Sequence, residues 1–283
     1  MSKETRQVKL VECPRDAIQG IHQFIPTADK IDYINALIES NLFDCIDFGS
    51  FVSPKAVPQM ADSAQVLEGL QLINDTKLLA IVANEKGTEE AASLSKIHFL
   101  GYPFSISEEF QRRNTNSDIK TSFRRLQNIV QIAHDNGKEV VAYLSMAFGN
   151  PYGEEWNEEL VTYWLGEIAN LGIIDFSLAD TTGEANPFQI TTLFEKAYKD
   201  FPKLDIGAHF HSSKTTGLLK IKAAYEAGCR KFDGAILGFG GCPFATDELV
   251  GNIAMEDLLF YFERGDPISI LALEQQFNQM IKV

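Results

Sequence analysis

The chain has 283 residues, of which 45% are hydrophobic and 23% are charged, and its formal net charge is −14 at pH 7. A strongly acidic protein repels nucleic acids and anionic membranes at long range, so we expect neither as a partner. No apolar run approaches the roughly 20 residues of a membrane-spanning helix. The start, MSKETRQ, is polar and does not resemble a signal or transit peptide. The four scattered cysteines include no C-x-x-C pair, which predicts a reducing compartment. Together these features predict a cytoplasmic location.

Short runs rich in Val, Ile and Phe alternate with amphipathic stretches along the chain. Runs that are apolar on both faces suit strands of a buried parallel sheet, and the stretches between them repeat apolar residues three and four positions apart, as helices do. A final helix is expected at about 268–281. Eight strands are predicted, at residues 8–13, 43–49, 77–83, 96–101, 139–145, 173–180, 204–211 and 231–239.

Eight β/α units predict an α/β fold, a (β/α)8 TIM barrel with a short C-terminal helical extension. The length suits one barrel, and no Pro/Ser-rich linker divides the chain, so residues 1–283 are expected to form a single catalytic domain. A doubly wound open sheet is the alternative. It is disfavoured because no G-x-G-x-x-G motif follows the first strand.

Polar residues gather where these strands end, which is where TIM barrels place their active sites. Arg15 and Asp16 follow the first strand, Asp47 lies in the second and Asp180 ends the sixth. The seventh strand ends in HFH (209–211), and residues two apart in a strand point to the same face. Imidazole and carboxylate ligands with open positions suit a divalent ion such as Mg²⁺, Mn²⁺ or Zn²⁺.

Each of these signals also has a purely structural explanation. Arg15 and Asp16 would form an ion pair at the rim of the barrel, Asp180 would cap a turn, and an H-x-H pattern arises by chance at a strand end. Arg112 and Arg113 would either lie in a solvated surface loop or meet a phosphate group.

The segments VECPRDAIQ, SFVSPKAVPQM, HFH and GFGGCPF…GNIAMEDL together resemble the 3-hydroxy-3-methylglutaryl-CoA (HMG-CoA) lyases, over about residues 8–265. These lyases are metal-dependent TIM barrels of a wider group that includes isopropylmalate and homocitrate synthases. The resemblance implies retro-Claisen cleavage of HMG-CoA to acetoacetate and acetyl-CoA, in leucine degradation. An acyl-CoA is then the expected substrate, and Mg²⁺ or Mn²⁺ the expected ion, with Zn²⁺ as the alternative. A homodimer is the expected assembly.

The same resemblance assigns four metal ligands. The Asp of the R-D pair matches Asp16, the strand-seven histidines match His209 and His211, and the Asn of the GN pair matches Asn252.

Catalytic roles also follow from the resemblance. Arg15 matches the residue that steadies the enolate oxygen, and Cys242 matches a loop cysteine of proton transfer. Asp47 stands where the family has Glu, and Asp180 matches the Asp of its GDT motif. The base that accepts the hydroxyl proton is either His209 or Asp16. The expected catalytic residues are Arg15, Asp16, Asp47, Asp180, His209 and Cys242.

Several positions depart from the family pattern and keep other functions open. The chain reads RDAIQG, with Ala17, Ile18 and Gly20, where the family has R-D-G-L-Q-N, and Ser212 replaces an Asp after the second histidine. The alternatives are a lyase or aldolase for a different 3-hydroxyacyl-CoA, an acetyl-CoA-condensing synthase, or a silent relative that only binds a metal or acyl-CoA. The synthase is disfavoured because GGCP is not its pattern and the chain ends soon after the eighth unit. The silent relative is disfavoured because the predicted catalytic and ligand residues are all present.

Overall fold

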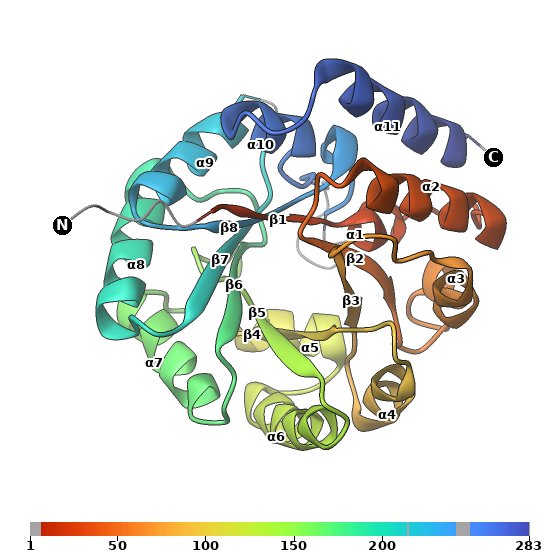
Figure 1. Ribbon diagram of the computed structural model, residues 1–283. Helices are drawn as coiled ribbons and strands as arrows, with labels where there is room; N and C mark the ends of the chain where they lie inside the picture. The colour runs from red at the N-terminus through yellow and green to blue at the C-terminus, as the bar shows by residue number, and fades with distance from the viewer. Residues whose placement is uncertain (1–6, 214, 242–249, 283) are drawn as a thin grey trace.

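A closed barrel of eight parallel strands forms the centre of the computed structural model, which describes residues 7–213, 215–241 and 250–282. The strands follow one another around the barrel in chain order, which confirms the predicted (β/α)8 fold. Figure 1 shows the strands at the centre and the helices around them. The strands are β1 (Lys9–Glu12), β2 (Cys45–Ser50), β3 (Lys77–Ile81), β4 (Phe99–Ser105), β5 (Glu139–Ser145), β6 (Asp175–Asp180), β7 (Asp205–Phe210) and β8 (Lys231–Gly234).

Helices connect successive strands and cover the outside of the barrel. Among the described residues, none of these helices combines the length and the apolar character needed to cross a membrane. The helices are α1 (Pro14–Ile18), α2 (Thr27–Ser40), α3 (Ser63–Gly69), α4 (Glu85–Ser93), α5 (Glu108–Thr115), α6 (Ile119–Asp135), α7 (Glu158–Ala169), α8 (Pro187–Asp200), α9 (Gly217–Glu226), α10 (Met255–Tyr261) and α11 (Pro267–Met280), with 3-10 turns η1 (Pro58–Met60) and η2 (Ile236–Gly238).

The main core lies between the strands and the helices, because both faces of each strand are buried. A smaller apolar cluster fills the barrel interior and includes Val11, Leu79, Val141 and Tyr143. Cys13, Cys45 and Cys229 are buried, as expected of packing residues. The C-terminal extension, α11, packs on α2, where the Tyr33 and Phe277 rings meet edge to face at 5.4 Å (Figure 1).

Two predicted strands, β4 and β8, have boundaries that are wrong by three residues or more, while the other boundaries agree within two residues. β4 begins three residues later than predicted and continues through Pro103 to Ser105. Its pairing with β3 ends at Gly101, so the missing N–H of the proline costs no hydrogen bond on that side. β8 stops at Gly234 rather than 239, since Leu237 has a left-handed backbone (φ 61°) and belongs to η2.

Candidate active site and metal centre

A short helix places two of the predicted residues at the top of β1. Pro14 occupies the first turn of α1, where its missing N–H is harmless, so Arg15 and Asp16 follow the strand directly. The Arg15 guanidinium lies between two carboxylates, with Nη1 2.9 Å from Asp16 Oδ1 and Nη2 2.5 Å from Asp47 Oδ2. Gln19, one turn further on, donates from Nε2 to the same Asp16 oxygen at 2.6 Å. Asp16 is thereby held in a single orientation.

The two carboxylates beside Arg15 differ in acidity. Burial alone would raise the pKa of Asp16, but Arg15 and the two nearby histidines lower the pKa to about 2. Asp47 is buried more deeply, and there the burial outweighs Arg15 and raises the pKa to about 6. Asp16 is therefore a fixed anion near neutral pH, whereas Asp47 takes up a proton in mildly acidic solution.

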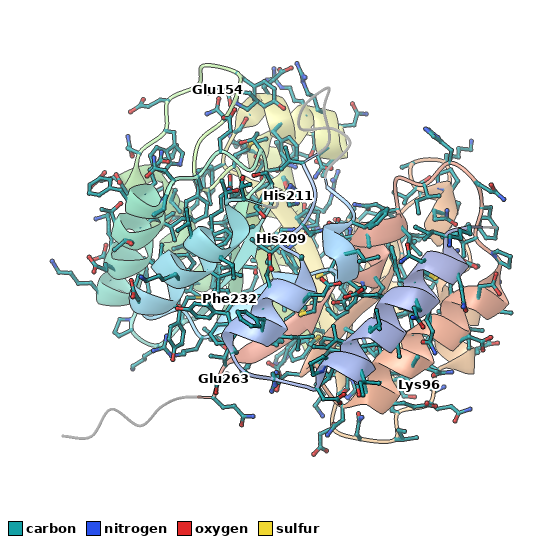
Figure 2. The ribbon with its side chains drawn as sticks, turned by 90° about the horizontal axis from the view of Figure 1, so that it is seen from above. Lys96, Glu154, His209, His211, Phe232 and Glu263 are labelled. Atoms are coloured by element: carbon teal, nitrogen blue, oxygen red, sulfur yellow. The ribbon has the colours of Figure 1, made fainter. Side chains whose placement is uncertain are left out.

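Each histidine of β7 is oriented by a hydrogen bond at Nδ1. His209 Nδ1 lies 3.1 Å from Asp233 Oδ2, and His211 Nδ1 lies 3.0 Å from the Thr181 carbonyl oxygen. Both contacts leave Nε2 as the free ring nitrogen, which is the arrangement found around metal-binding histidines. Figure 2 shows the two residues in the interior, with His211 nearer than His209 to the end of the molecule marked by Glu154.

Three predicted ligands converge on one point. One ligand atom each of Asp16, His209 and His211 lies within 4.8 Å of the others, a spacing that a single metal ion can bridge. His211 Nε2 is buried and has no hydrogen-bond partner within the described part of the chain. Burial lowers the pKa of His211 to about 4, which keeps the ring neutral and able to bind a metal. The donor set therefore fits a divalent cation.

The fourth predicted ligand, Asn252, lies beside this group. Its backbone forms an antiparallel bridge with His211, and its Nδ2 donates to Asp16 Oδ2 at 2.6 Å and to the Phe239 carbonyl at 2.9 Å. These contacts engage the amide nitrogen and leave Oδ1 as the oxygen available to a metal. Gly240 allows this approach, because a Cβ there would lie 2.6 Å from Asn252 Nδ2.

A second group, Cys13, His209 and Asp233, also has ligand atoms within 4.8 Å of one another. It fits a metal less well, because burial raises the pKa of the Cys13 thiol far above its usual value and only the thiolate binds metals. Asp233 Oδ2 already accepts from Ser177 Oγ at 3.0 Å as well as facing His209. Asp233 is therefore better described as the residue that orients His209.

A cavity of about 590 Å³ opens from the ligand group. Asp16, His209 and His211 are among the residues that line it, and so are Arg113 and Arg125. Other lining residues give it an apolar wall, namely Val52, Val57, Ile81, Pro103 and Phe110. A separate cavity of about 630 Å³ lies at the amino-terminal ends of the strands, lined by residues such as Asp44, Lys77 and Lys231.

Two expected catalytic carboxylates, Asp47 and Asp180, are not among the residues that line this cavity. The Asp180 carboxylate is buried against Lys220 and the Ala185 amide, and it is not among the residues that line the cavity. Cys242 lies outside the described residues.

Sequence reasoning missed Asp233, Lys220 and the orienting role of Gln19. The first two are charged residues with no spacing that points to a ligand set.

Comparison with known proteins decides the family. The sequence profile of the HMGL-like family matches residues 7–280. The chain belongs to the HMGL-like family. A curated relative from Pseudomonas aeruginosa, named 3-hydroxy-3-isohexenylglutaryl-CoA/hydroxymethylglutaryl-CoA lyase, is 36% identical over 256 residues, which is 90% of this chain and 84% of the relative. A hydroxymethylglutaryl-CoA lyase of Bacillus subtilis is 34% identical over 262 residues, covering 93% of this chain and 87% of the relative.

Solved structures agree with this membership of the HMGL-like family. An HMG-CoA lyase from Acinetobacter baumannii, in complex with coenzyme A and 3-methylmalate, matches with a TM-score of 0.90 at 30% identity, over 100% of this chain and 93% of that chain. The hydroxymethylglutaryl-CoA lyase of P. aeruginosa matches with a TM-score of 0.89 at 32% identity, over 98% and 94%. The resemblance seen in the sequence motifs is thus confirmed.

Proposed function

We propose that this chain is a divalent-metal-dependent carbon–carbon lyase that cleaves HMG-CoA to acetoacetate and acetyl-CoA. The observation that carries the proposal is the convergence of Asp16, His209 and His211 beside Arg15, at the carboxyl ends of the strands. The names of the relatives support the substrate, since they match most of this chain and most of their own lengths. A silent relative would have no need for this oriented set of ligands.

The ion would be held by Asp16, His209, His211 and Asn252. Two of these ligands are oxygen atoms, which favours Mg²⁺ or Mn²⁺, with Zn²⁺ as the alternative. When bound, a divalent ion supplies a Lewis acid that polarises a substrate oxygen and lowers the pKa of the substrate hydroxyl. Asp16 and His209 are the candidate acceptors of the hydroxyl proton. The pKa of about 2 makes Asp16 the weaker base, and the hydrogen bond that His209 Nδ1 donates to Asp233 helps to raise the pKa of His209 despite its burial. Because Nδ1 is engaged by Asp233, His209 would accept the proton through Nε2, and it would do so only while Nε2 is not bound to the ion.

Arg15 is placed to stabilise the enolate that forms when the carbon–carbon bond breaks. A guanidinium has five N–H donors, and within the described residues Arg15 makes four hydrogen bonds: two to Asp47 and one each to Asp16 and Gln19. One N–H of Nη2 is therefore left for substrate. Because the flanking carboxylates fix the cation in advance, it needs no rearrangement as negative charge develops on the substrate.

Two further roles concern the coenzyme and the final proton transfer. Arg113 and Arg125 also line the cavity. We propose that these two residues face the phosphates of coenzyme A. Cys242 is proposed to protonate the enolate carbon. Cys242→Ala should then lower turnover strongly and leave Mn²⁺ binding intact; unchanged turnover would contradict that role.

A longer 3-substituent on the substrate is a second candidate. The cavity lining includes apolar residues that would suit a longer apolar substituent, and the P. aeruginosa relative is named for a 3-isohexenylglutaryl substrate. Comparing kcat/KM for HMG-CoA and for the isohexenyl thioester separates the two possibilities.

A turnover assay tests the proposal directly. Purified protein with Mg²⁺ or Mn²⁺ should form acetoacetate from HMG-CoA, and EDTA should abolish the product. Metal binding without product from HMG-CoA would shift the proposal to another branched 3-hydroxyacyl-CoA, whereas product that resists EDTA would refute the metal mechanism. A single catalytic domain over residues 1–283, a homodimer and a cytoplasmic location stay predictions.

A further inference from the structure

A buried lysine connects the ends of two barrel strands beside the ligand group. Lys220, on α9, is only 2% exposed, and its Nζ lies 2.5 Å from Asp180 Oδ2, 2.7 Å from the Gly183 carbonyl and 2.8 Å from the His211 carbonyl. An ammonium group has three N–H donors, so these contacts use all of them. A lysine is rarely buried to this extent, and here it joins the end of β6, the loop after it and the end of β7.

The three acceptors belong to one hydrogen-bonded unit that includes a predicted metal ligand. The His211 amide donates to the Asp180 carbonyl at 3.3 Å, and its Nδ1 contacts the Thr181 carbonyl at 3.0 Å. Gly183 packs closely against the same residue, because a Cβ there would lie 3.2 Å from the His211 carbonyl oxygen. A shift of the segment 180–183 would therefore move the His211 ring.

We propose that Lys220 is a positioning residue for the metal centre. By fixing the segment 180–183 relative to the His211 carbonyl, it keeps the Thr181 carbonyl against His211 Nδ1 and so holds the His211 ring with Nε2 facing Asp16 and His209. The inference rests on the proposed function, since it takes His211 to be a metal ligand. It also gives Asp180 a role other than the predicted catalytic one: the carboxylate orients the lysine.

The simpler alternative is that Lys220 and Asp180 only stabilise the fold. The chain offers a matched pair for comparison. Lys30 is also 2% exposed, and its Nζ lies 2.8 Å from Asp62 Oδ1 and 2.5 Å from the Gln59 carbonyl. This second pair joins α2 to the start of α3 and, within the described residues, has no hydrogen bond to a predicted metal ligand. The two pairs thus share chemistry and an equally buried lysine, although Asp62 is 9% exposed and Asp180 2%, and they differ in their connection to His211.

Two double variants separate the alternatives: D180N/K220M and D62N/K30M. Each removes both charges of its pair, so neither leaves a buried charge unpaired. Mn²⁺ alone is titrated into the EDTA-treated full-length chain, with free Mn²⁺ measured by electron paramagnetic resonance, and Tm is measured without metal. Both variants should change Tm by similar amounts. Only D180N/K220M should raise the Kd for Mn²⁺, by about 10- to 100-fold, the range typical for residues that orient metal ligands.

Gly183→Ala provides a second variant that leaves the ion pair intact, in case D180N/K220M does not fold. Its Cβ would crowd Val250 at 2.7 Å and the His211 carbonyl, and it should also weaken Mn²⁺ binding. If the parent binds Mn²⁺ and forms acetoacetate but D180N/K220M or Gly183→Ala binds Mn²⁺ equally well, this inference is overturned and the proposed function stands. A parent chain that binds no Mn²⁺ would overturn both.

Discussion

Asp233 provides the most direct test of how the site is built. Its Oδ2 accepts hydrogen bonds from His209 Nδ1 at 3.1 Å and from Ser177 Oγ at 3.0 Å, in a place almost closed to water. Asp233→Asn keeps the shape and one acceptor oxygen but removes the charge. A hydrogen bond to a charged group contributes about 1.5–3 kcal/mol and a neutral one about 0.5–1.5, so the change costs about 1–2 kcal/mol. Because each 1.4 kcal/mol is tenfold, the Kd for Mn²⁺ should rise roughly 5- to 30-fold.

The control is another aspartate of the barrel whose carboxylate is engaged by two donors. Asp44 Oδ2 accepts from the Leu10 amide at 2.8 Å and from Arg264 Nη1 at 2.7 Å, and it lines the cavity at the opposite end of the barrel. Asp44→Asn should lower Tm without changing Mn²⁺ affinity. Both variants are titrated with Mn²⁺ under the same conditions as the parent. Equal Kd values for Asp233→Asn and the parent would refute the assignment of Asp233 as the residue that orients His209.

Three further predictions follow from the site. The pKa of about 6 means that the folded chain holds the Asp47 proton more tightly than the unfolded chain, so this group lowers the free energy of unfolding as pH rises from about 4 to 6. Asp47→Asn should reduce that decline by at most about 3 kcal/mol, measured by urea unfolding of the metal-free chain at several pH values. An identical pH dependence in the variant and the parent would contradict this prediction. Arg15→Lys should lower kcat about 100-fold or more, because one ammonium cannot replace the fork between Asp16 and Asp47; unchanged kcat in the HMG-CoA assay would exclude Arg15 as the stabilising cation. Gly240→Ala should weaken Mn²⁺ binding roughly tenfold, because the added Cβ displaces Asn252. Gly172 has a similar positive φ but open space around it, so Gly172→Ala should leave Mn²⁺ binding unchanged. Equal effects of the two substitutions on Mn²⁺ binding would point to backbone strain alone.

Much of the fold could be predicted because each strand is a short apolar run with polar ends. The errors lie where a tertiary contact overrides a local signal. Pro103 reads as a strand breaker, yet β4 contains it because β3 no longer pairs there. Leu237 reads as a strand residue, but its amide is held by Glu256 Oε1 at 2.8 Å and the preceding amide by Glu12 Oε1 at 3.0 Å, which bends the chain after β8.

The candidate site was predictable to the extent that it depends on motifs. The H-x-H spacing and the R-D pair predicted three metal ligands, and the barrel brings these three residues together. Residues that act through another residue carry no such signal. Asp233 is one acidic residue within an apolar strand, and Lys220 is one lysine on an amphipathic helix, and only the closed barrel shows what each one contacts. Asp180 shows the reverse: a motif match predicted a catalytic carboxylate, and the structure turns that carboxylate toward Lys220.

The hydrogen bond between Asp16 and Asn252 joins residues that are 236 positions apart in the chain. Formation of the site therefore depends on the closure of the barrel, in which β8 docks against β1, the strand pair with the largest separation in sequence. In a partly folded chain that has formed β7 but lacks this closure, His209 and His211 are in place without Asp16 and Asn252. We therefore expect the ion to bind the closed barrel in preference to such intermediates. By mass action, such an ion adds RT ln(1 + [M]/Kd) to the free energy of opening that single seam, where [M] is the free ion concentration. Hydrogen exchange of the β1 and β8 amides, with and without Mn²⁺, would therefore follow metal occupancy more sensitively than exchange at β4 and β5.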